Sequence, residues 1–101
     1  MVSYTIRISQ GKKPIPVMET ADPKYQLAGE LFLAERSFLK ELISFAEDDS
    51  ESEFNGNAFS VRKEADSVLI ENTVTEEKIK LVQSDFLDLL NAYYFEYKRI
   101  R

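Results

Sequence analysis

Three short segments between residues 57 and 82 alternate apolar and polar side chains, as strands with one buried face do. They cover 57–63, 67–73 and 78–82, with connections of turn length between them. Strands joined this closely pair antiparallel, because parallel neighbours need a long crossover. The pattern therefore predicts a meander whose buried face holds Phe59, Val61, Val68, Ile70, Ile79 and Leu81.

The N-terminal segment 3–8 also alternates, and its β-branched and aromatic residues favour a further strand. The segment 14–18 can be extended as well. Its two prolines, Pro14 and Pro16, lack the backbone N–H that a central strand needs. We therefore expect it at a sheet edge or in a loop.

Two amphipathic helices are expected, one before and one after the meander in the sequence. Asp22 followed by Pro23 is typical of a helix start, and apolar residues at helical spacing predict a helix over 34–46. Gly29 weakens the helix signal, so 22–33 remains either helix or strand. Ser84 is the predicted N-cap of the last helix, whose buried side holds Phe86, Leu89, Leu90, Tyr93, Tyr97 and Ile100.

These elements predict an α+β fold in one domain over residues 1–101. We expect an antiparallel sheet of about four to five strands with two main helices packed on one face. A chain of 101 residues is of ordinary size for one domain.

The composition disfavours catalysis. The chain has no cysteine and no histidine, which excludes a Ser-His-Asp triad, a cysteine nucleophile and thiolate or imidazole metal ligands. We expect no enzyme activity and no cofactor. No run approaches the ~20 apolar residues that span a membrane, and no export signal is evident, so a cytoplasmic location is expected.

Charge is distributed unevenly along the chain. Residues 41–77 hold eleven acidic and two basic side chains, a balance of −9, whereas the remainder carries +4. An acidic surface repels phosphate, so we expect no direct nucleic-acid ligand. It attracts basic proteins instead.

The segment 47–53 holds five carboxylates in seven residues, which suggests a metal loop, a solvated linker or a contact surface. An EF-hand loop needs glycine at its sixth position and glutamate at its twelfth, and neither register of this segment supplies both. We therefore expect no metal site. The linker and the contact surface both remain open, and the candidate contact residues are Glu47, Asp48, Asp49, Glu51 and Glu53.

Aromatic residues crowd the last helix. Tyr93 and Tyr97 belong to the core on spacing, whereas Tyr94 and Phe95 could form an exposed patch. Tyr is favoured at protein interfaces, so Tyr94 is a further candidate for partner contact. A base-stacking platform is disfavoured, because the nearby basic charge in the sequence is confined to the C-terminal tail. Whether the patch closes a homodimer or the chain is a monomer stays open.

The C-terminal half, from FNGNAFSV through SVLIEN to IKLVQSDFLDLLNAYYFE, resembles small bacterial immunity proteins of contact-dependent growth-inhibition and other polymorphic toxin systems. Their pattern is an Asn-Gly-Asn turn, three short strands and a closing helix with a Ser or Thr cap. The matching positions, within 54–97, are Asn55, Gly56, Asn57, Val68, Ile70, Ile79, Leu81, Ser84, Phe86, Leu87 and Leu90. Where those proteins often have Trp at the helix centre, this chain has Tyr93 and Tyr94.

The resemblance implies a stoichiometric inhibitor that binds a basic, nuclease-type toxin domain. A small regulatory adaptor, or a phage-borne inhibitor of a host enzyme, is the alternative. An enzyme that uses carboxylates and tyrosines is a third hypothesis, which would require a deep pocket holding a desolvated glutamate.

Overall fold

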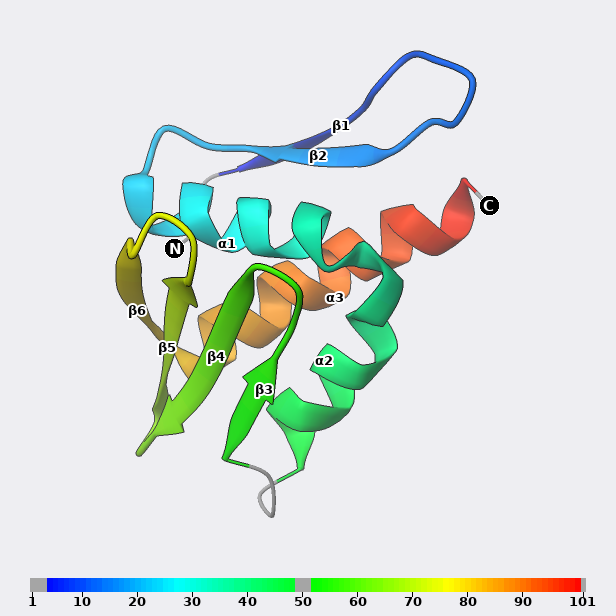
Figure 1. Cartoon of the computed structure of the whole chain (residues 1–101). Coiled ribbons are helices and arrows are strands. Elements are labelled where there is room, and N and C mark those ends of the chain that lie inside the picture. The colour runs from blue at the N-terminus through cyan, green and yellow to red at the C-terminus, as the bar shows by residue number, and fades with distance from the viewer. Residues whose placement is uncertain (1–3, 49–51, 101) are drawn as a thin grey trace.

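The computed structural model describes residues 4–48 and 52–100, in which two antiparallel sheets enclose helices (Figure 1). The fold is α+β, as expected from the sequence. Its elements are β1 (Thr5–Ile8), β2 (Pro16–Glu19), α1 (Pro23–Ala34), the 3-10 turn η1 (Arg36–Phe38), α2 (Leu39–Glu47), β3 (Glu53–Asn55), β4 (Phe59–Glu64), β5 (Ser67–Asn72), β6 (Lys78–Val82) and α3 (Gln83–Arg99).

The larger sheet has the strand order β3-β4-β5-β6 and confirms the predicted meander. Its register pairs Val61 with Ile70 and Ile70 with Ile79, so apolar side chains line one face. Five of the six side chains predicted for this face are buried, and Ile79 is half-buried. The sequence did not predict β3, which pairs with β4 at the edge of this sheet.

The N-terminal strands form a separate two-stranded sheet instead of extending the meander. In Figure 1 this hairpin lies across α1, on the side away from the larger sheet. Ile6 pairs with Met18 and Ile8 with Pro16 in its register. Pro16 and Met18 of β2 are buried, so the hairpin packs on the helical layer through these side chains.

Helix α1 begins where the sequence predicted, because the Asp22 side chain accepts a hydrogen bond from the Lys24 backbone N–H at 3.0 Å. The strand alternative for 22–33 is therefore wrong. Gly29 has a packing role here, since a Cβ on it would lie 3.2 Å from the Met18 Cβ. The missing side chain lets α1 approach β2 closely.

The predicted continuous helix over 34–46 is wrong, because α1 ends at Ala34 and α2 begins at Leu39. Glu35 lies at the break, with φ −108° and ψ 29°. The Arg36 side chain donates a hydrogen bond to the Leu33 carbonyl at 2.7 Å, which satisfies one of the carbonyls left open at the helix end. The chain then turns through η1 into α2.

Helix α3 closes the core with Phe86, Leu89, Leu90 and Tyr93, all of which are buried. The prediction that Ser84 caps it is wrong: the helix begins at Gln83, and its N-cap Val82 makes no side-chain cap hydrogen bond. The Tyr93 hydroxyl donates to the Pro16 carbonyl at 2.7 Å. This buried hydrogen bond ties the N-terminal hairpin to the last helix.

Candidate functional site

One carboxylate is fully buried. Glu35 has 0% exposure, and its two carboxylate oxygens accept backbone N–H groups from Asn57 at 2.8 Å and Ala58 at 2.9 Å. A buried carboxylate is tolerated when donors satisfy its oxygens, and two backbone N–H groups do so here. We call this contact the Glu35 bridge, and it joins the α1–α2 break to the β3–β4 turn.

The Glu35 bridge explains the glycine of the Asn-Gly-Asn turn. A Cβ on Gly56 would lie 2.4 Å from the Glu35 Cδ, closer than real Cβ atoms approach a neighbour. Gly56 also donates its N–H to the Phe59 carbonyl at 2.8 Å. The glycine is therefore required by close approach of the buried side chain.

A weak signal for this bridge is present in the sequence. Leu31, Glu35 and Leu39 follow each other at four-residue spacing, so Glu35 falls on the apolar stripe of the predicted helix. A charged residue on such a stripe needs a polar partner, and the partner is a turn more than twenty residues away. That separation hides the pair from local pattern analysis.

The end of α2 carries exposed acidic residues. Glu47 is the last residue of the helix and Asp48 is its C-cap, and both are exposed. Lys63 of β4 donates to the Asp48 backbone carbonyl and lies 4.8 Å from the centre of the Phe45 ring. Lys63 of the larger sheet therefore lies beside the C-terminal end of α2, where Glu47 and Asp48 give an excess of negative charge.

Glu53 lies nearby on the edge strand β3, opposite Arg62 of β4. It is exposed and accepts a hydrogen bond from the Asn55 side chain at 2.9 Å. We call Glu47, Asp48 and Glu53 together the acidic end of α2. Two further candidates, Asp49 and Glu51, lie outside the described residues.

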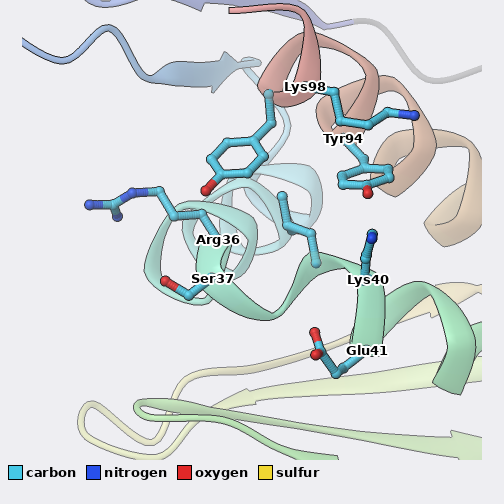
Figure 2. Close-up of a pocket in the computed structure, with 8 residues that line it drawn as sticks. Arg36, Ser37, Lys40, Glu41, Tyr94 and Lys98 are labelled. Carbon is cyan, nitrogen blue, oxygen red and sulfur yellow. The ribbon is translucent and has the colours of Figure 1, made fainter. Parts of the chain in front are cut away.

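Tyr94 lies elsewhere, in a groove of about 720 Å³ between the start of α2 and the C-terminal half of α3. Among the described residues, its lining includes neither Glu47 nor Asp48 nor Glu53. The structure therefore separates Tyr94 from the acidic candidates. Leu39 and Tyr97 line the groove, together with the residues labelled in Figure 2, which are Arg36, Ser37, Lys40, Glu41, Tyr94 and Lys98.

The groove brings together basic side chains that the sequence keeps apart. Arg36 and Lys40 come from the α1–α2 region, and Lys98 from α3 has its ammonium group 4.7 Å from the centre of the Tyr94 ring. The premise that the basic charge near these aromatics is confined to the C-terminal tail is therefore wrong. With Glu41 the lining carries a balance of +2, in a chain whose net charge is −5.

Within 4–48 and 52–100, no group of three or more acidic side chains is arranged to hold a metal ion. In the same residues no helix combines the length and apolarity needed to cross a bilayer. Compared with protein-family models, curated proteins and solved structures, the chain matches none of them.

Proposed function

We propose that this protein binds and neutralises a basic protein, as the immunity proteins of bacterial toxin systems do. The observation that carries the proposal is the acidic end of α2. Its three described carboxylates are exposed, and they belong to the part of the chain whose balance is −9. A cationic protein surface is the partner chemistry that this charge fits.

Helix physics supports a role for the Glu47 carboxylate outside folding. The C-terminus of a helix carries partial negative charge, so each acidic side chain there costs roughly 0.3–1 kcal/mol. No basic residue occupies the last turn of α2, although Lys63 of β4 donates to the Asp48 carbonyl. A cationic partner would turn this unfavourable local charge into a favourable interaction.

The proposed mechanism is occlusion without catalysis. Nuclease-type toxins bind phosphate through basic surfaces, and an acidic protein competes for such a surface and speeds encounter through long-range attraction. The buried glutamate, Glu35, has no exposed surface, so a substrate has no contact with its carboxylate. In this proposal the protein acts in the bacterial cytosol, where such a toxin would meet its substrate.

The first test is affinity capture from the native organism with the full chain, followed by washes of rising salt concentration. We expect a basic protein that elutes with salt, arrests growth when expressed alone, and loses its activity at a one-to-one ratio with this chain. Attraction between exposed charges weakens as salt shortens the Debye length, to about 8 Å at 0.15 M.

A charge-matched pair of variants locates the binding surface. The triple variant Glu47→Gln, Asp48→Asn, Glu53→Gln should slow association with the captured protein by about tenfold at low salt. The control Glu30→Gln, Glu76→Gln, Asp88→Asn has the same net charge, and it alters exposed carboxylates on other elements. Equal rates for the two variants would reject this surface. A captured host enzyme, or a toxin that stays active when saturated, would reject neutralisation.

A further inference from the structure

The groove beside Tyr94 differs from the acidic end of α2 in charge and in shape. Its volume of about 720 Å³ lies within the roughly 300–1,000 Å³ typical of ligand pockets. The half-buried rings of Tyr94 and Tyr97 supply apolar surface, and three cationic side chains stand around them. A surface of this composition suits a ligand that carries both negative charge and apolar groups.

The two lysines of the groove, Lys40 and Lys98, are available to a ligand. Neither Lys40 nor Lys98 forms an ion pair with any residue in the described part of the chain. Lys40 lies in the first turn of α2, where a positive charge opposes the helix dipole. Figure 2 shows Lys40 and Lys98 extending toward the Tyr94 side chain from the two helices. Lys98 lies in the last turn of α3, where a cation is favourable, so only the position of Lys40 brings no gain for its own helix.

The details favour an acidic peptide over a nucleic acid. A polyphosphate chain needs a continuous cationic track, and the Glu41 carboxylate in the lining interrupts the one in this groove. The Lys98 ammonium covers one side of the Tyr94 ring, which removes that side as a stacking surface for a base. A peptide with separated carboxylates needs no continuous cationic track.

We propose that this groove is a second binding site, which takes a short acidic segment of a partner protein. Carboxylates of the segment pair with Lys40 and Lys98. An apolar side chain of the segment packs against the half-buried rings of Tyr94 and Tyr97. Arg36 gives one N–H to the Leu33 carbonyl and keeps other donors for a third contact. The site is independent of the acidic end of α2, so either proposal can fail alone.

The test is a titration of the isotope-labelled full chain, followed by amide chemical shifts. The probe is the capped hexapeptide acetyl-DELDEL-amide, with its neutral analogue acetyl-NQLNQL-amide and a uridine hexanucleotide as comparisons. We expect saturable shifts concentrated at Lys40, Tyr94 and Lys98 with the acidic peptide, which weaken with salt. Binding of the neutral analogue should be at least about tenfold weaker, since its side chains form no ion pair with Lys40 or Lys98.

The variant Lys40→Ala, Lys98→Ala should weaken peptide binding by about tenfold or more. The control Lys24→Ala, Lys78→Ala removes the same charge from exposed positions on α1 and β6. Amide spectra of both variants establish that they are folded. Equal losses in the two variants, equal binding of the neutral peptide, absence of shifts at millimolar peptide, or preference for the oligonucleotide would each overturn the proposal.

Discussion

Two glutamates at the two ends of the η1–α2 segment have opposite environments. Glu35 is fully buried and accepts two backbone N–H groups from a distant turn, whereas Glu47 is exposed at the C-terminal end of α2. The first carboxylate holds two halves of the chain together. The second opposes the dipole of its own helix and contributes nothing evident to the fold.

The difference shows how burial separates structural charges from available ones. A buried carboxylate persists because leaving its donors unsatisfied costs more than its desolvation. An exposed carboxylate is screened and contributes little to stability, so selection can place it for a partner. The comparison predicts large losses of stability at Glu35 and small gains at Glu47.

The largest expected effect is that of Gly56→Ala. The new Cβ would collide with the Glu35 carboxylate, so the side chain must leave its hydrogen bonds or the turn must move. We expect the free energy of unfolding to fall by about 3 kcal/mol, measured by urea denaturation. In a Glu35→Ala background the same substitution should cost less than about 1 kcal/mol, because the collision is gone. Equal costs in both backgrounds would contradict the bridge.

Glu35→Gln tests the charge of the bridge with little change of shape. The amide keeps one oxygen acceptor but turns an NH₂ group toward a backbone N–H of Asn57 or Ala58. A loss of about 2 kcal/mol in unfolding free energy is expected, by the same urea measurement. Glu30→Gln on the exposed face of α1 is the matched control and should change stability by less than about 0.5 kcal/mol. A similar small effect at Glu35 would break the comparison.

Tyr93→Phe tests whether a buried neutral polar group, the Tyr93 hydroxyl, stabilises the fold as the buried Glu35 carboxylate does. Loss of the hydroxyl leaves the Pro16 carbonyl without its donor, so we expect a loss of about 1–2 kcal/mol at neutral pH. Thermal unfolding followed by circular dichroism would measure it. An unchanged melting temperature would mean that the hairpin does not depend on this hydrogen bond.

The same variant has a pH signature. Burial raises the pKa of Tyr93 from 10.0 to about 12, so the unfolded chain loses this proton before the folded chain does. The stability that the neutral phenol contributes is complete below pH 10 and is lost as the pH rises toward 12. The advantage of the natural chain over Tyr93→Phe should therefore shrink between about pH 10 and pH 12. A pH-independent difference would contradict the burial of this group.

The smallest effect, of opposite sign, is expected at the acidic end of α2. Glu47→Lys places a cation at the negative end of the helix and should raise the unfolding free energy by about 0.3–1 kcal/mol. High salt should reduce this gain because the site is exposed. Denaturation at two salt concentrations would measure it. A loss of stability would show that Glu47 has a structural partner after all.

Local patterns in the sequence determined much of the fold. The alternation over 57–82 predicted β4, β5 and β6, and Asp22 with Pro23 predicted the start of α1. The apolar spacing after Ser84 predicted the buried side of α3, although the helix begins one residue earlier than its expected cap. These features follow from the period of a single strand or helix, which neighbouring residues alone express.

Tertiary contacts decided the rest. The helix breaks at Glu35, whose side chain accepts hydrogen bonds from the turn at Asn57 and Ala58, and a spacing rule within one helix contains no such contact. Tertiary contacts also separated the candidate contact residues. Folding placed Tyr94 in a groove with Lys40 and Lys98, away from the acidic end of α2. Residues distant in the sequence meet only when the helices pack, so charge in the groove follows from the three-dimensional arrangement and not from the order of the chain.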